Sequence, residues 1–441
     1  MTTIRFCTAA TAIAFGCTTR TPPSDPAGGD DSPTASADGA DHVPVVDPTK
    51  PVPPTSCPVL GTPGSVIAQY AITGGDIVAV GPDGNTVYTA DEGIVKITPK
   101  GTTVYSFPFG SVFALDDAGN AFVAGSFTAP IDFGGGVTLS PMGNVDVFVA
   151  KLTPSGKLVF AIDLGLCGAG LEAIAVAHDG RIAVSGESMG TAVLDASGKL
   201  LFDLSYDGQL AFDSIGDLYI AGSFVGSIDF GGGHVLNAAS ATDTDGFLVR
   251  VDCGGAFVSS VQFGDAPLPV LDFPDAPITT PRPQTIAAIA INANDRVAVL
   301  GTFQDEMLLF GDTLVLPSGL PSGIGLGTFA AELEGGNTPV FGRLIDQHYS
   351  YNPPGAIAID GDDNVIASTN HTSEAFFPFA IPTLYKLEPT KGATIWSYPL
   401  GELRGYGLGV ATTACGDVVW ADTEHSSVLI PLQPTLRLIA R

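Results

Sequence analysis

One eighteen-residue segment occurs twice in this chain and constrains its fold more than any other feature. Gly119–Gly136 and Gly216–Gly233 align without a gap and share eleven identities, including the strings AGSF and IDFGGG. Unrelated segments do not match over such a length, so the chain contains repeats of one structural unit.

The sequence around the first copy predicts what that unit is. Short apolar runs at 112–116 and 121–127 flank the turn Asp117–Asn120, and two more at 146–152 and 157–164 flank the turn Thr153–Gly156. Tight turns between short apolar runs are typical of β-hairpins. The unit is therefore predicted to be a four-stranded antiparallel meander.

The turn between the first two strands can be followed through the whole chain. Each copy combines Gly, Asn and Asp, which tolerate a positive φ in tight hairpins, and lies between two apolar runs. The seven copies are PDGN at 82–85, DAGN at 117–120, HDGR at 178–181, SIGD at 214–217, NAND at 292–295, GDDN at 361–364 and ACGD at 414–417.

Seven four-stranded units without intervening helices predict an all-β fold, a seven-bladed β-propeller of four-stranded antiparallel blades. A closed ring removes the sheet edges that an open sheet would expose, whereas the coils of a β-helix are shorter and more uniform. We expect Ser65–Ile72 to pair into the last blade and close the ring. The first strands are predicted near Ile77, Val112, Ile174, Leu210, Ile289, Ile357 and Val410.

A second pattern follows the turn between strands three and four, where an aromatic residue lies four positions after a glycine. The pairs are Gly101/Tyr105, Gly156/Phe160, Gly198/Phe202 and Gly392/Trp396. In units four and five, Val258 and Val340 are assigned to the aromatic position.

The N-terminus is predicted to be a targeting segment. Arg5 precedes the short apolar run Phe6–Phe15, which fits a secretory signal peptide and is too short to cross a bilayer. Ala14-Phe15-Gly16-Cys17 resembles the cleavage box of bacterial lipoproteins, with Ala14 where leucine is usual, and Cys17 would then carry the lipid. Ordinary cleavage after Ala12-Ile13-Ala14 and plain secretion remain the alternative.

Three regions follow from this assignment. Residues 1–16 are the signal peptide, and residues 17–60, rich in Pro, Thr, Ser and Asp, are a disordered linker that tethers the domain. Residues 61–441 form the propeller. Nothing else in the sequence is apolar for long enough to anchor the chain in a membrane.

The charge of the chain excludes some partners. Lys and Arg number 18 against 46 Asp and Glu, a formal net charge of −28. Phosphates of nucleic acids and anionic lipid headgroups repel such a surface, so we expect no nucleic acid and membrane contact only through the N-terminal lipid. The carboxylates can also serve simply to keep a β-rich surface soluble.

The pattern GNxxVAGSFxxxIDFGGG, followed by DVFVAKLTPSGKLVFAIDLG, resembles the SBBP family of bacterial β-propeller repeats. The resemblance covers units two and four well and unit five in part. It implies a propeller outside the cytoplasm, in a secreted or envelope protein. The family has no agreed activity, so the resemblance assigns no functional residue.

No catalytic motif survives inspection of its surroundings. Gly186–Gly190 matches the G-x-S-x-G nucleophile elbow, but that motif needs a helix after the turn, and a second hairpin strand is predicted here. The six histidines, His42, His178, His234, His348, His371 and His425, show no zinc-site spacing. Trp396 and Trp420 are too few for a quinone-dependent propeller dehydrogenase.

Two segments resemble fragments of calcium loops. They are Asp360-x-Asp362-x-Asn364 and Asp243-x-Asp245-Gly246, and neither has the distal glutamate of such a loop. Asp362–Asn364 also belongs to the turn pattern, which explains it without a metal. We therefore expect no cofactor and keep calcium as an alternative.

Two functions of different classes remain. The first is a non-enzymatic, monomeric envelope lipoprotein, of the outer membrane or otherwise secreted, whose propeller binds an envelope protein or a glycan. The second is a hydrolase or lyase that uses carboxylates at the central channel as acid and base, for which two carboxylates about 5 to 10 Å apart would be needed.

Strand alternation predicts a disulfide and a binding face. Cys415 lies in the one–two turn of the last blade, and Cys57 precedes the strand that closes that blade from the same side. An extracytoplasmic compartment permits a Cys57–Cys415 bond; free or buried thiols are the alternative. The two–three loops and blade-to-blade loops, including Gly264–Gln284, lie on the opposite face, where we expect binding.

Overall fold

The computed structural model describes residues 61–165, 170–265, 283–316, 326–348, 355–371, 381–400, 404–425 and 433–441. These residues belong to the larger of two compact units, Pro53–Arg441. The smaller unit, Met1–Val52, lies outside them, as do the predicted signal peptide and linker. Within the described ranges all regular structure is β-strand.

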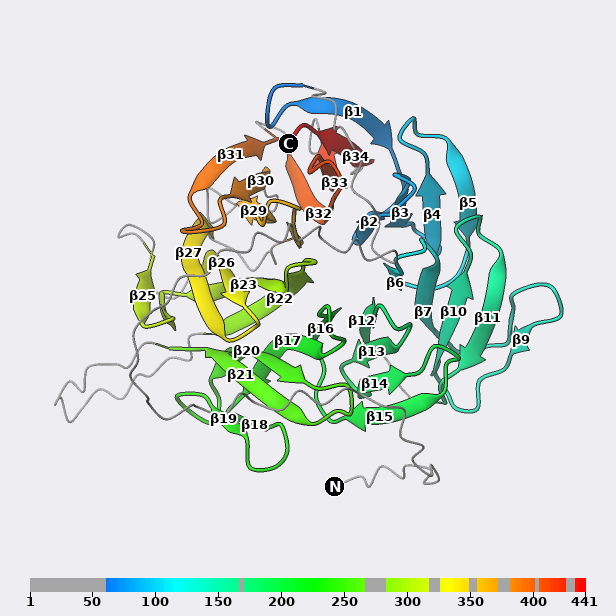
Figure 1. Ribbon diagram of the computed structural model, residues 1–441, viewed down its shortest axis with the longest axis horizontal. Helices are drawn as coiled ribbons and strands as arrows, with labels where there is room; N and C mark the ends of the chain where they lie inside the picture. Colours follow the sequence, from blue (N-terminus) through cyan, green and yellow to red (C-terminus); the bar gives the residue numbers. More distant parts are fainter. Residues whose placement is uncertain are drawn as a thin grey trace, which may run out of the picture. The chain divides into compact units, whose positions relative to one another are not determined.

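Seven four-stranded antiparallel sheets stand around a common centre, so the predicted propeller is confirmed (Figure 1). Blade one comprises β2 (Val78–Val80), β3 (Thr86–Thr89), β4 (Ile94–Ile97) and β5 (Thr103–Phe107). Blade two comprises β6 (Val112–Leu115), β7 (Ala121–Phe127), β10 (Asp146–Leu152) and β11 (Leu158–Asp163). Blade three comprises β12 (Leu171–Val176), β13 (Ile182–Gly186), β14 (Gly190–Leu194) and β15 (Leu200–Leu204).

The remaining blades follow the same order from the centre outward. Blade four comprises β16 (Gln209–Phe212), β17 (Leu218–Val225), β20 (Thr244–Val251) and β21 (Phe257–Phe263). Blade five comprises β22 (Gln284–Ile291), β23 (Arg296–Gln304), β26 (Leu326–Glu334) and β27 (Thr338–His348). Blade six comprises β28 (Ile357–Ile359), β29 (Val365–His371), β30 (Ile381–Leu387) and β31 (Thr394–Pro399).

Blade seven joins the two ends of the domain. Its first three strands are β32 (Arg404–Thr412), β33 (Val418–His425) and β34 (Gln433–Ile439). Its fourth strand is β1 (Val66–Ala71), which pairs antiparallel with β34. The predicted closure by the N-terminal strand is therefore confirmed, and rupture of the ring requires the loss of this pairing.

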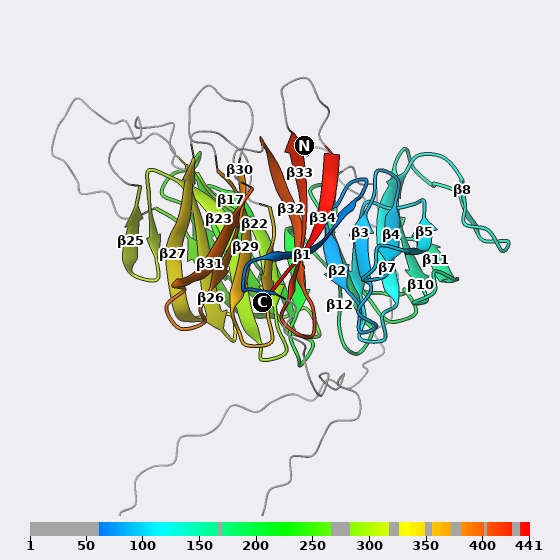
Figure 2. The same cartoon turned by 90° about the horizontal axis from the view of Figure 1, so that it is seen from above.

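The two faces of the ring differ. One, here called the turn face, carries the tight turns between strands one and two and between strands three and four. The other, the loop face, carries the two–three loops and the blade-to-blade connections (Figure 2). Three two–three loops form small hairpins there: β8 (Ile131–Asp132) with β9 (Thr138–Leu139), β18 (Ser227–Asp229) with β19 (Val235–Asn237), and β24 (Glu306–Leu309) with β25 (Asp312–Val315).

The repeated IDFGGG motif anchors two of these hairpins with a phenylalanine. Phe133 packs against Phe107 and Phe109 from blade one and Phe148 from blade two, with ring centroids 5.0 to 6.0 Å apart. Phe230 is buried, and the centroid of its ring lies 5.0 Å from that of the Tyr206 ring. The motif therefore packs aromatic rings in and beside the blade junctions and turns the chain.

An aspartate immediately before the one–two turn, which the predicted turn pattern did not include, holds the turn in several blades. In blade two, Asp116 accepts hydrogen bonds from the backbone N–H groups of Ala118 and Asn120 at 3.1 and 2.8 Å. Asp213 and Asp360 do the same in blades four and six. A carboxylate just before each of these turns thus satisfies backbone donors that would otherwise face solvent.

A side chain of each blade covers a turn glycine of the next. The rings of Tyr105, Phe202, Phe341, Trp396 and Tyr70 lie against Gly156, Gly255, Gly392, Gly64 and Gly101, and Ile162 and Tyr219 lie against Gly198 and Gly336. Three aromatics of the glycine–aromatic pattern, Tyr105, Phe202 and Trp396, therefore make contacts between neighbouring blades. In blade two, Ile162 makes the contact in place of Phe160. The assignment of Val340 in blade five was wrong by one position, because Phe341 makes this contact.

We predict that Gly156→Ala destabilises the protein more than Gly134→Ala does. Both glycines have a positive φ, 83° and 82°, so both substitutions carry a backbone cost of about 1–2 kcal/mol. A Cβ on Gly156 would lie 2.5 Å from the Tyr105 ring, whereas nothing lies within 4 Å at Gly134. Overpacking adds about 1–3 kcal/mol at Gly156. Urea unfolding of the two variants measures the difference, and equal losses would contradict the packing argument.

Candidate functional site

The seven innermost strands leave a channel along the ring axis. A cavity of about 440 Å³ runs through it and is lined by residues from all seven blades. Aliphatic residues such as Val112, Ile174 and Ile357 line it together with polar residues. The channel is therefore a shaft of mixed character, with backbone, aliphatic and polar groups in its wall.

Polar groups gather at the end of this shaft on the loop face. Asp76 and Ser111 precede the first strands of blades one and two, Glu172 lies at the start of β12, and Gln209 opens β16; all four line the cavity. These residues surround the same end of the channel because the first strand of every blade starts on the loop face. The channel mouth so formed is the candidate functional site.

A side pocket of about 210 Å³ extends the mouth between blades three, four and five. It is lined by Glu172, Asp207, Ser223 and neighbouring backbone. Partial burial, and then repulsion from Asp207 and from Glu187, raises the pKa of the Glu172 carboxyl. Glu172 and Asp207 line the same small pocket, and two carboxylates that share a pocket attract cations or hydrogen-bond donors.

The motifs singled out from the sequence lie elsewhere. Ser188 of the G-x-S-x-G match sits in the hairpin turn between β13 and β14, so the nucleophile elbow is absent there. Asp360 pairs with Lys386 at 2.8 Å while holding its turn. His178 pairs with Asp117, and His234 stacks on Phe257. Among the described residues no three His, Cys, Asp or Glu side chains form a group that could hold a metal ion.

The sequence analysis missed a buried or half-buried cation on the third strand of several blades, two residues before the three–four turn. Four blades carry one, and each pairs with a carboxylate of the one–two turn on the turn face. The pairs are Lys96 with Asp83, Lys151 with Asp116, Arg250 with Asp213 and Asp217, and Lys386 with Asp360. The string AKLTPSGK contained the signal, but only the fold shows where its lysine points.

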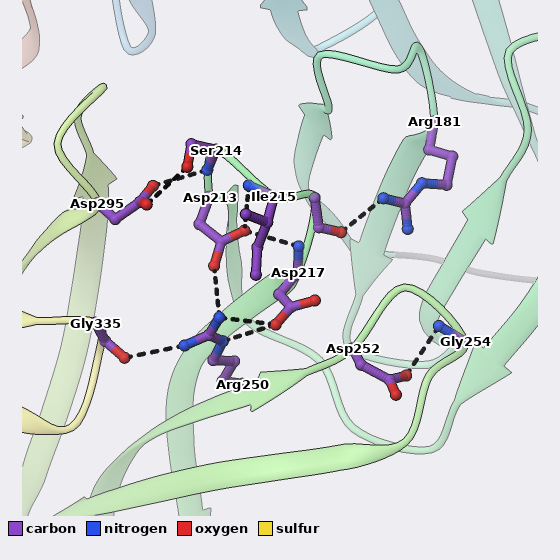
Figure 3. A network of polar contacts seen from close by, with 11 residues as sticks. Arg181, Asp213, Ser214, Ile215, Asp217, Arg250, Asp252, Gly254, Asp295 and Gly335 are labelled. Carbon is purple, nitrogen blue, oxygen red and sulfur yellow. Dashed lines mark hydrogen bonds and ion pairs between the residues drawn. The ribbon is translucent and has the colours of Figure 1, made fainter. Parts of the chain in front are cut away.

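Arg250 shows how this cation also joins blades (Figure 3). Its guanidinium lies 3.0 Å from Asp213 and 2.8 Å from Asp217 within blade four. It donates a further hydrogen bond to the carbonyl of Gly335 in blade five. Beside it Ser214 donates to Asp295 of the same neighbouring blade at 2.7 Å, so one cluster fixes both the turn and the junction.

Blade five reverses this charge. Glu332 occupies the strand-three position, is 0% exposed, and has no hydrogen-bond partner for either carboxylate oxygen. The Arg296 guanidinium is 3.9 Å away. Burial raises the pKa of Glu332 to about 7, Arg296 opposes this shift, and Asp363 and Glu388 add to it.

We predict that Glu332→Gln stabilises the protein at pH 8 but not at pH 4.5. The folded state binds more protons than the unfolded state between the ordinary pKa of 4.5 and about 7, so wild-type stability falls as pH rises through that window. At pH 8 the gain is at most about 3 kcal/mol. Urea unfolding at both pH values measures it. Glu334→Gln, exposed on the same strand, is the control, and an equal gain there would contradict the prediction.

Two described cysteines are disulfide-bonded, Cys253 and Cys415. They lie in turns of blades four and seven, and Figure 1 shows the strands of these two blades on opposite sides of the ring. The remaining four, Cys7, Cys17, Cys57 and Cys167, lie outside the described residues. The Cys57–Cys415 pairing therefore stays a prediction, and the bond at Cys253 was not anticipated.

The position of the described N-terminus supports that pairing. The Gly64 N–H donates to the Ala440 carbonyl at 3.0 Å, and Arg441 donates to the Cys415 carbonyl at 2.9 Å. The chain therefore enters blade seven on the turn face, near Cys415. Cys57 is four residues before Gly61, a separation that an extended chain spans in at most about 14 Å.

Comparison with known proteins defines the fold and no further property. No family model and no curated protein matches the chain. A chain of Kuenenia stuttgartiensis hydrazine synthase is similar over 84% of this chain and 100% of its own length, at 10% identity and a TM-score of 0.52. A chain in the crystal structure of a mitotic checkpoint complex covers 88% of this chain and 96% of itself, at 9% identity and a TM-score of 0.47. At these identities the likeness to hydrazine synthase concerns the propeller architecture alone.

In the part of the chain that the structure describes, no helix has the length and apolar character needed to cross a bilayer.

Proposed function

We propose that this protein is a non-enzymatic binding or scaffolding module of the bacterial cell envelope that engages its partner at the channel mouth on the loop face. The convergence of Asp76, Glu172 and Asp207 from three blades on that mouth carries the proposal. Rigid rings commonly bind through the loops and strand ends on one face. The partner is an envelope protein or a glycan that presents cations or hydrogen-bond donors.

The envelope location rests on the sequence. The lipoprotein-like box at Cys17, the linker to residue 60 and the SBBP-type repeats together favour an anchored protein, with secretion as the alternative. Because the chain enters blade seven on the turn face, a tether there would turn that face toward the membrane. The loop face would then point outward, toward a partner.

We expect the full-length protein with Asp76→Asn, Glu172→Gln and Asp207→Asn together to capture less of its envelope partner in pull-downs than wild type. The substitutions remove three charges from the loop face without changing side-chain size. Asp362→Asn with Asp91→Asn, on exposed positions outside the channel, is the control. Undiminished capture by the loop-face variant would refute the proposed site.

An enzymatic alternative has one observation in its favour. Glu172 is a carboxyl of raised pKa beside Asp207 in a side pocket, the combination used by acid–base pairs of hydrolases and lyases. Turnover of an envelope glycan that Glu172→Gln abolishes, with glycan binding retained, would favour this alternative. Binding and turnover are thus separated by one variant.

The cysteines test the anchor independently. We expect non-reducing peptide mapping of the purified protein to find Cys57 linked to Cys415 and Cys17 in a lipidated peptide. A lipid-bearing cysteine has no free thiol, so it cannot also form a disulfide. A bond between Cys17 and Cys253 would exclude the lipid anchor, and a free Cys57 would exclude the predicted pairing.

A further inference from the structure

A second polar cavity lies on the loop face, away from the channel. It has a volume of about 340 Å³ and is bounded by the outer strands of blade four, the end of the β18–β19 hairpin and the β24 strand of blade five. The backbone N–H of Leu308 donates to the carbonyl of Gly264 at 2.9 Å and closes one side. Asn237, Asp245, Gln262 and Asp265 line it.

Asp245 is the unusual member of this lining. It is 1% exposed, and its Oδ1 atom is buried without a hydrogen-bond partner. Its carboxylate lies directly against the Gly264 backbone, where an added Cβ would come within 2.4 Å of Oδ2. A buried carboxylate oxygen without a donor is costly, so its retention at a cavity wall points to a missing positive group.

Other oxygens converge on the same place. The Gln262 side-chain nitrogen donates a hydrogen bond to Asp245 Oδ2 and another, at 2.8 Å, to the Asn237 carbonyl oxygen. Both oxygens therefore point toward the Gln262 amide. Asp265, which lines the same cavity, accepts a hydrogen bond from the Gln284 amide at 2.7 Å.

We propose that this cavity is a Ca²⁺ site in which the carboxylates of Asp245 and Asp265 and the main-chain carbonyl of Asn237 are the protein ligands. A half-turn of the Gln262 amide would replace its NH₂ group by an oxygen and add a fourth ligand. Water fills the remaining positions, for which the cavity has room. Oxygen-only ligands and a roomy, irregular site favour Ca²⁺ over Zn²⁺ and Mg²⁺.

The site differs from the calcium loop considered in the sequence. Asp243 and Asp245 were weighed there as neighbours in one linear loop, whereas the ligands here come from the β18–β19 hairpin, β20 and the segment after β21. Only two acidic side chains take part, which agrees with the lack of any three-residue acidic or histidine cluster in the described ranges.

The proposal is tested on the full-length protein with Ca²⁺ itself. After EGTA treatment and removal of the chelator, 10 mM CaCl₂ at pH 7.5 should raise the melting temperature by about 2–4 °C, as expected for a site of the affinity of extracellular calcium modules. The same concentration of MgCl₂ should have a smaller effect.

Matched variants separate this site from general ion effects. Asp245→Asn and Asp265→Asn should each abolish the calcium shift, whereas Asp312→Asn, an exposed charge on the neighbouring β25 strand, should retain it. Asp265, which is less buried than Asp245, serves if the Asp245 variant fails to fold. Calorimetry should give one Ca²⁺ per chain in wild type. No shift in wild type, or an undiminished shift in both site variants, overturns the proposal.

Discussion

The ring depends on one repeated contact, in which a side chain of one blade lies over a glycine in the three–four turn of the next. At Gly156 and Gly101 the covering groups are tyrosine rings, and a Cβ would collide with them at 2.5 Å. Because the glycine has no side chain, the two blades approach closely enough to bury the rings between them. At the closing junction Gly64, just before β1, stands in the place of a turn glycine and receives Trp396. The N-terminal strand thus completes the same contact that the other blades make.

Polar contacts on the turn face reinforce every junction. Each blade donates or accepts at least one hydrogen bond across to its neighbour: Lys96 to Pro154, His178 with Asp117, Arg181 to Gly216, Ser214 to Asp295, Asn292 to Asp363, Thr412 to Ile359, and Tyr70 to Pro99. The strand-three cations Arg250 and Lys386 pair with the buried carboxylates Asp213 and Asp360, and removal of either partner would leave a buried charge unpaired. The polar side chains of the turn face therefore stabilise the contacts between neighbouring blades.

The architecture could be predicted from the sequence because its signals are local. Turn residues and apolar runs recur within each unit, and the seven predicted first strands are all found. In blade five Val340 was assigned to the aromatic position, which Phe341 occupies. The three–four hairpin of this blade has one more residue pair, Glu334 with Thr338, so the residue opposite Glu332 is Phe341. The channel mouth could not be predicted, since Asp76, Glu172 and Asp207 come from three blades and none stands in a motif. Only ring closure brings them together.

The two faces of the ring differ in what their side chains do. Contacts between blades occupy the turn face, and the candidate binding sites lie on the loop face. On the turn face the side chains hold the blades together, so a substitution there alters a junction. In blade five the buried Glu332 stands where four other blades have a cation, and the nearest positive group is the Arg296 guanidinium at 3.9 Å. On the loop face the hairpins β8–β9, β18–β19 and β24–β25 extend beyond the blades, and a Cβ added at Gly134 or Gly231 would meet nothing within 4 Å. Residues there can change without opening the ring. Buried carboxylates with unmet hydrogen-bonding capacity occur on both faces, Glu332 on the turn face and Asp245 on the loop face. Of these two, Asp245 lines a cavity on the face that does not hold the ring together.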